Sequence, residues 1–291
     1  MADADERHEV LLREAAKLMG MLFIGRREAK AVFTNGQWIA KREKYTLGDF
    51  REHLFGSTCL GAYLLDADSM VKCIAFDIDV LSSNSDPKNP GEKRGAPYYL
   101  IEDAVDSDHS EIIGQLDLES QRGDLESALH DPTHPGHRWA CSLVLSAVQF
   151  IKTVVHDTLG LTSTVIITGG GAHVFVPFGE PIPAAEGRAM AHSVMEGIPI
   201  FKRTSENFYN NSERDPSLTI EIFPKQDALT DSDSLGNLIR LPFGLHECGI
   251  RTYALDPKVP ILPSWSLPRM NSMDALRLAA ACVNLQWDLV E

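Results

Sequence analysis

The sequence predicts a mixed α/β or α+β fold built around one main sheet. Residues 138–158 carry apolar side chains at helical spacing, whereas 72–80 and 218–223 alternate apolar and polar residues as half-buried strands do. These helical and strand patterns are interleaved along the chain. With 291 residues, 44% of them hydrophobic, the chain is long enough to bury a large core.

The elements are expected in the following order. A helix over 8–20 precedes strands over 31–34, 60–65 and 72–80, with Asn35-Gly36 as a hairpin turn. Residues at about 82–137 are polar and form a surface insertion, disordered in part or weakly helical. The helix over 138–158 ends at Gly160. Strands over 164–168 and 173–178, a helix over 184–197, a strand over 218–223 and a helix over 274–283 complete a single core over 1–291.

Charge is distributed unevenly along the chain. The formal net charge is -14, which is unfavourable for a protein that binds nucleic acid through a basic surface. Residues 81–137 hold twelve Asp and Glu against four Lys and Arg, a net of -8, so the remaining residues carry only -6. Residues 26–44 instead hold six basic side chains against two acidic ones. A net-acidic chain can therefore still present a basic surface locally.

Cysteine usage and the N-terminus bear on the compartment. The five cysteines are scattered and form no C-x-x-C pair, which indicates a reducing, cytoplasmic setting. The acidic N-terminus lacks the basic and then apolar order of a secretory signal. No uninterrupted apolar run approaches the ~18 residues of a membrane span, so no membrane partner is expected.

Two carboxylates share one face of the predicted strand at 72–80. Ile74, Phe76 and Ile78 alternate with Asp77 and Asp79, which places both aspartates on the opposite face with Cα atoms about 6–7 Å apart. At that spacing they could share hard cations. The alternative is a strand edge with two solvated aspartates.

A third carboxylate lies on the predicted strand at 218–223. Leu218, Ile220 and Ile222 point one way, whereas Glu221 points the other. It is either a solvated edge residue or, beside Asp77 and Asp79, a third oxygen ligand for a pair of Mg²⁺ or Mn²⁺ ions.

A glycine turn joins two further strands in Thr168-Gly169-Gly170-Gly171-Ala172-His173. Glycines let backbone N–H groups approach an anion closely, and His173 can donate to a phosphate oxygen. The turn is neither a P-loop nor a dinucleotide fingerprint, because a strand follows it. Lys225, Arg240 and His246 are further candidate triphosphate contacts. Each of these features alone could equally be an ordinary turn or a surface residue.

Taken together and in order, these motifs resemble the archaeo-eukaryotic primase superfamily over roughly residues 45–265. The D-x-D pair is Asp77 and Asp79, the glycine turn ends in His173, and the third acidic residue is Glu221. The run from Glu221 to Gln226 (E-I-F-P-K-Q) and the run from Leu235 to His246 are most similar to primase-polymerases of TOTE conflict systems and CRISPR-associated primase-polymerases.

The resemblance implies a catalytic core with an N-terminal α/β part and an RRM-like sheet that carries the active site. It implies a DNA primase/polymerase, a nucleotidyltransferase that joins NTPs or dNTPs on a single-stranded or primed template by two-metal catalysis with Mg²⁺ or Mn²⁺. Its site residues would be Asp77, Asp79 and Glu221 as catalytic metal ligands, and Thr168, Gly169, Gly171, His173, Lys225, Arg240 and His246 as nucleotide contacts. Helicase, nuclease or CRISPR-type proteins would be partners.

The sequence departs from the superfamily pattern in three places. Thr168 stands where Ser is common, and Glu221 stands where many members have Asp. The acidic stretch between the first two motifs is long, and some superfamily members carry a zinc knuckle there. His130, His134, His137 and Cys141 have plausible spacing for Zn²⁺, although a loop and the start of a helix explain the segment equally well.

Two other classes of protein compete with this interpretation. A phosphatase of the haloacid-dehalogenase type has a similar D-x-D strand, but it leaves the glycine turn and the Glu221 strand unexplained. A catalytically inactive nucleic-acid-binding module could keep the same fold, although retention of all three carboxylates and His173 argues against it.

Overall fold

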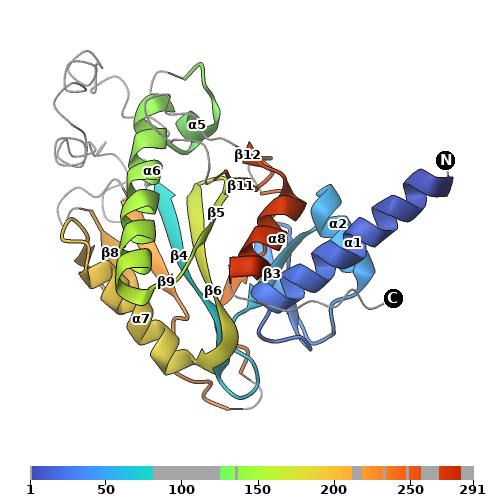
Figure 1. Ribbon diagram of the computed structural model, residues 1–291, viewed down its shortest axis with the longest axis horizontal. Coiled ribbons are helices and arrows are strands. Elements are labelled where there is room, and N and C mark those ends of the chain that lie inside the picture. Colours follow the sequence, from blue (N-terminus) through green and yellow to red (C-terminus); the bar gives the residue numbers. More distant parts are fainter. Residues whose placement is uncertain are drawn as a thin grey trace.

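Two antiparallel sheets organise the computed structural model, which describes residues 2–80, 125–134, 137–211, 218–231, 234–246, 249–256 and 269–282 (Figure 1). The larger sheet has the strand order β12-β11-β5-β6-β4-β9-β8-β7, and the smaller has the order β10-β3-β1-β2. Helices and antiparallel strands are mixed along the chain, which confirms the predicted α+β class.

The centre of the larger sheet is built from the strands that the alternating patterns predicted. They are β4 (Met70–Val80), β6 (Gly171–Pro183), β9 (Leu218–Phe223) and β5 (Thr164–Ile167). Strand β6 is longer than expected and begins two residues before His173. The outer strands are β8 (Phe208–Asn210), β7 (Lys202–Arg203), β11 (Tyr253–Leu255) and β12 (Arg269–Met270).

Helices α6 (His137–Val154) and α7 (Ala184–Glu196) cover one face of this sheet (Figure 1). Gly187 of α7 packs directly on Ile74 and Val71, so this is the face to which Ile74, Phe76 and Ile78 point. The opposite face carries Asp77 and looks toward the N-terminal part of the chain. There Phe23 packs on Phe175, which pairs with Ala75. Both faces of β4 are therefore packed around Ala75, and only the end of the second face that carries Asp77 and Asp79 is partly exposed and available for chemistry.

The apolar character of α6 reflects this burial. The helix runs into a π-helical turn, Val155–Leu159, and ends at Gly160 in the left-handed conformation, as predicted. Within the described part of the chain, 137–159 is the one helical stretch long and apolar enough to cross a membrane. Ten of its side chains between Trp139 and Ile151 are buried in the core. Core packing therefore accounts for its hydrophobicity.

The N-terminal part combines predicted and unpredicted elements. Helix α1 (Ala2–Leu22) extends the expected helix, and β1 (Lys30–Thr34) and β2 (Gln37–Lys41) form the expected hairpin. Asn35 and Gly36 both have positive φ, as a primed turn requires. Strands β3 (Cys59–Tyr63) and β10 (Leu238–Arg240) complete the small sheet.

Helix α2 (Leu47–Phe55) corrects the sequence interpretation, which expected only strands and turns between residues 30 and 80. The missed signal is a capping box, in which the Asp49 N–H donates to the Thr46 hydroxyl and the Thr46 N–H donates to the Asp49 carboxylate. Most of the predicted acidic insertion, 81–124, lies outside the described residues. Its end forms the short helix α5 (Leu125–His130).

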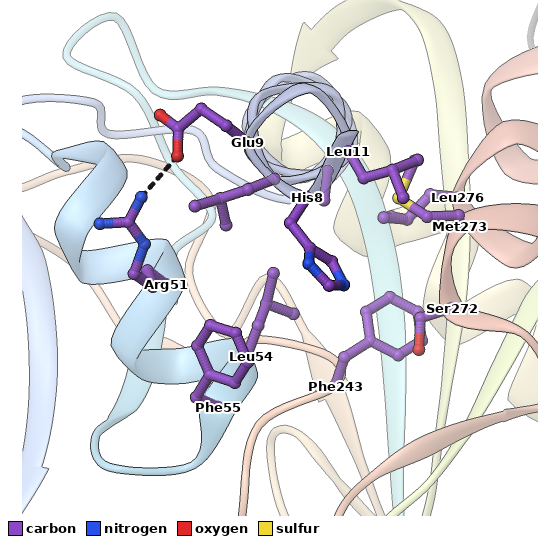
Figure 2. A pocket seen from close by; sticks show the side chains of 12 residues that line it. His8, Glu9, Leu11, Arg51, Leu54, Phe55, Phe243, Ser272, Met273 and Leu276 are labelled. Carbon is purple, nitrogen blue, oxygen red and sulfur yellow. Dashed lines mark hydrogen bonds and ion pairs between the residues drawn. The ribbon is translucent and has the colours of Figure 1, made fainter. Parts of the chain in front are cut away.

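A pocket of about 510 Å³ lies between α1, α2 and α8 (Ser272–Cys282) (Figure 2). Arg277 of α8 forms a bidentate ion pair with Glu14 of α1, with both N–O distances 2.7 Å, and so holds the two terminal helices together. The pocket is lined largely by apolar side chains, including Leu54, Phe55 and Phe243. None of the candidate site residues lines it, so it is separate from the predicted chemistry.

His53 of α2 provides a test of how this part of the fold is held. Its buried ring donates from Nε2 to the Pro242 carbonyl at 2.8 Å and accepts at Nδ1 from the Leu60 N–H at 3.1 Å. Protonation of Nδ1 breaks the second bond, and burial lowers the pKa of His53 to about 4.

Because the folded-state pKa of His53 lies below the unfolded value of about 6.5, its contribution to stability is present above that value and is lost as the pH falls toward 4. The expected loss is about 3 kcal/mol of unfolding free energy, measured by urea denaturation at pH 7 and at pH 4. His53→Gln should be less stable at pH 7 and less sensitive to pH. An unchanged pH dependence in this variant would contradict the assignment.

Candidate active site

Asp77 stands at the centre of a row of polar side chains that crosses three strands. The register pairs Asp77 of β4 with His173 of β6 on one side and with Glu221 of β9 on the other. Directly paired residues of neighbouring strands share a face, and period two adds Asp79 to the same face. The three carboxylates therefore gather on one side of the sheet, and the predicted pairing of the Glu221 strand with the Asp77 strand is confirmed.

The glycine turn is shaped by close contact with β4. An added Cβ on Gly171 would lie 1.8 Å from the Ile78 carbonyl oxygen, so only glycine fits beside this strand. The Gly171 N–H donates to the Thr168 hydroxyl at 3.1 Å, and the Thr168 N–H donates to the Gly171 carbonyl. Thr168 and Gly171 thus close the turn upon itself. Their predicted contact with a nucleotide remains a prediction, whereas their structural role is evident.

A further histidine, missed as a site residue by sequence reasoning, supports this turn. His130 of α5 donates from Nε2 to the Gly169 carbonyl at 3.0 Å. The contact ties the end of the acidic insertion to the turn that precedes His173. The sequence carries one signal for this residue, the cluster of histidines around position 130.

Two cationic side chains, Lys225 and Arg240, lie beside the row. Lys225 forms an ion pair with Glu221, and its ammonium lies 4.6 Å from the ring centroid of Phe223. Arg240 enters from β10 of the smaller sheet, where its guanidinium lies against Phe33 and Trp38 and donates to the Cys59 sulfur at 3.0 Å.

These groups shift the pKa values of the carboxylates in opposite directions. Burial opposes ionisation of Asp77, but His173, which lies 3.0 Å away (Nε2 to Oδ1), together with Lys225 and Arg240, lowers its pKa below the ordinary value. Burial raises the pKa of Glu221, as does the charge of Asp77, and the raising effects outweigh Lys225. Glu221 therefore resists ionisation more than Asp77 does. Such divergent pairs are typical of active sites.

His246 lies in the same electrostatic neighbourhood. Burial and the charges of Arg240 and His173 lower its pKa to about 4, so its ring is neutral at pH 7. The structure therefore brings all four candidate phosphate-binding side chains around Asp77. Lys225 lies on the Glu221 side of the row. Any contact of His246 with a phosphate would come from a neutral N–H donor.

The carboxylates suit a divalent cation by chemical type and by position. Asp77, Asp79 and Glu221 are hard oxygen donors on one face, as Mg²⁺ and Mn²⁺ prefer. In the described chain, however, no three His, Cys, Asp or Glu side chains converge as a set of metal ligands. Asp77 accepts from His173 and Glu221 pairs with Lys225, so both carboxylates are engaged within the protein.

The zinc hypothesis gains no support from the placement of its residues. His137 makes its 2.8 Å hydrogen bond through Nδ1 to the Ala128 carbonyl, and His130 is engaged by Gly169. The Cys141 thiol is buried, and burial raises its pKa to about 12. No group of three potential ligands forms among those four residues, all of which are described.

The fold and the row of site residues fit the primase-type core that the motifs predicted. Residues 25–249 match a family model, the Archaeo-Eukaryotic Primase domain of TOTE conflict systems. The chain therefore belongs to this family, as the motifs indicated. No curated protein matches the chain. All of α1 and all of α8 lie outside the matched residues.

The close approach at Gly171 predicts a strong effect of one methyl group. Gly171→Ala should destabilise the protein by about 1–3 kcal/mol, because the new Cβ forces β6 away from β4 next to Asp77 and Asp79. Urea denaturation measures the loss. Gly20→Ala is the matched control, since nothing lies within 4 Å of its added Cβ in α1, and it should be neutral or slightly stabilising. Equal effects of the two changes would refute the packing argument.

Proposed function

We propose that the protein is a template-directed nucleotidyltransferase, a DNA primase/polymerase that joins nucleotides with release of pyrophosphate. The observation that carries the proposal is that three carboxylates lie on one face of the sheet, beside cationic and imidazole groups. They are Asp77, Asp79 and Glu221. Concentrated negative charge beside groups that can bind phosphate suits a reaction in which a polyphosphate is positioned and attacked.

The side chains near Asp77 are assigned different roles according to their positions. We assign the triphosphate to His173 on the β6 side of Asp77, together with Arg240 and His246, whose charges or dipoles act on the same carboxylate. His173 donates from Nε2 to Asp77 in the substrate-free protein, and the same N–H can donate to a phosphate oxygen. Arg240 is pre-positioned by two aromatic rings, so little conformational freedom is lost when it binds an anion.

Asp77, Asp79 and Glu221 would hold Mg²⁺ or Mn²⁺, which would activate the attacking hydroxyl and stabilise the leaving pyrophosphate. The lowered pKa of Asp77 keeps this carboxylate ionised and ready to bind a cation at neutral pH. Lys225 neutralises Glu221 when no metal is bound, which limits the repulsion within the row.

The substrates implied are NTPs or dNTPs on a single-stranded or primed template, and helicase, nuclease or CRISPR-type proteins are the partners implied by the resemblance. A cytoplasmic location is consistent with the buried free thiols of Cys59, Cys73 and Cys141. Family membership favours nucleotidyl transfer over the phosphatase hypothesis. An inactive binding module of the same fold is the alternative that experiment must address.

Substitution of the carboxylates tests the proposal. Asp77→Ala and Asp79→Ala should each abolish incorporation, and Glu221→Gln should reduce turnover on the order of 10²–10³-fold, because each removes charge from the metal site. Glu221→Asp should retain partial activity. The measurement is primer extension with Mg²⁺ or Mn²⁺, with labelled NTPs and dNTPs offered separately on primed and unprimed single-stranded DNA.

The matched control is Glu186→Gln on α7, which removes an exposed carboxylate from the helix that covers the opposite face. It should extend primers as the parent protein does. Normal extension by Asp77→Ala or Glu221→Gln would remove that residue from the active site. Nucleic-acid binding by the parent protein without any extension would identify an inactive binding module instead.

A further inference from the structure

The row of site residues continues one strand beyond Glu221. In the register of β9 and β8, Glu221 pairs with Phe208, so the row runs from His173 through Asp77 and Glu221 to an aromatic ring. Phe208 is 38% exposed, whereas its neighbour Tyr209 points to the opposite face and is buried. An exposed ring thus lies at the same level as the carboxylates, on the same face of the sheet.

Two lysines lie on the same face of the sheet as this ring. The Lys225 ammonium lies 5.9 Å from the ring centroid of Phe208 while it pairs with Glu221. Lys202, an exposed residue of β7, pairs with Asn210 of β8, and Asn210 pairs with Thr219 of β9. Thr219 in turn pairs with Asp79 of β4. Register therefore places Lys202 on the face that carries the active site.

An exposed aromatic ring beside lysines has the chemistry of a single-stranded nucleic-acid site. Nucleic-acid bases stack on aromatic faces while cations meet the phosphates of the same strand. Isolated exposed apolar side chains are common on protein surfaces and require no explanation by themselves. What distinguishes Phe208 is its register with Asp77 and Glu221. Phe55 of α2, which is 73% exposed and lines the pocket of Figure 2, has no such relation to the row.

The direction of the reaction decides which strand would stack there. In phosphoryl transfer the attacking and leaving oxygens lie roughly in line on opposite sides of the phosphorus. His173 of β6, and His130, which is bonded to the turn before β6, lie on the β6 side of Asp77, and the leaving pyrophosphate is assigned to that side. The attacking 3′-hydroxyl then approaches from the other side, over Glu221 and toward Phe208.

We propose that Phe208 is a stacking platform for the terminal bases of the primer strand, with Lys202 and Lys225 meeting the phosphates of that strand. The assignment to the primer rests on the proposed nucleotidyl transfer, because the direction of attack defines the two sides of the row. The strand β8 and its neighbours would thus hold the growing 3′ end beside Glu221.

Binding experiments test the platform without catalysis. A fluorescently labelled primer–template with a dideoxy-terminated primer is titrated with protein, and anisotropy gives the Kd. Phe208→Ala should weaken binding by about 5- to 100-fold, the range for loss of one stacked base. Phe208→Trp should retain affinity, and its added indole fluorescence should be quenched when DNA binds. Phe55→Ala, the matched loss of an exposed ring, should bind as the parent protein does.

A second arm identifies the strand. An abasic nucleotide near the primer 3′ end should weaken binding by the parent protein but have little further effect on Phe208→Ala, because the stacking partner is already gone. If an abasic template nucleotide shows this non-additivity with Phe208→Ala and an abasic primer nucleotide does not, the assignment of the platform to the primer would be overturned. Unchanged affinity of Phe208→Ala, with normal extension by the parent protein, would overturn the platform alone. Failure of the parent protein to extend any primer would instead overturn the proposed function.

Discussion

The arrangement of the site depends on the register of one strand between two others. Strand β4 is antiparallel to both β6 and β9, and this pairing sets Asp77 directly between His173 and Glu221. A shift of one residue would turn every side chain of β4 to the opposite face and bring Ile74, Phe76 and Ile78 out of the core. Burial of those apolar side chains under α6 and α7 therefore also fixes the position of the carboxylates. The close approach of Gly171 to Ile78 adds a second constraint on the same register.

The electrostatics of the site follow from this placement. Carboxylates gathered on a half-buried surface repel one another, and this repulsion is offset at Asp77 by His173 and at Glu221 by Lys225. Arg240 adds its charge from the smaller sheet, so the site needs both sheets. The net charge of -14 thus coexists with positive groups concentrated at the row, since more than half of the acidic excess falls within 81–137.

Local sequence patterns predicted the elements of the site better than their connections. Alternation placed Asp77 and Asp79 on one face, and the same rule placed Glu221 opposite its apolar neighbours, because side-chain direction in a strand is a local property. Strand pairing decides which residues of neighbouring strands lie beside Asp77 and Glu221, and a local pattern does not reveal it. The position of Phe208 beside Glu221 therefore could not be predicted from the sequence. The capping box of α2 was a local signal that was overlooked. The role of Thr168 as a partner of Gly171 depends on the geometry of the turn and is not encoded by residue type.

The segment between Arg240 and His246 shows why a motif can be mostly structural. The Pro242 carbonyl accepts from His53, and the Phe243 carbonyl accepts from Arg251 at 3.1 Å. An added Cβ on Gly244 would lie 2.1 Å from the His53 ring, so the glycine is required by contact with α2. Phe243 adopts a positive φ of 71°, which is strained for a bulky residue and is maintained by the packing around it. The residues between Arg240 and His246 therefore pack the segment against α2, and this packing positions Arg240 and His246 near Asp77.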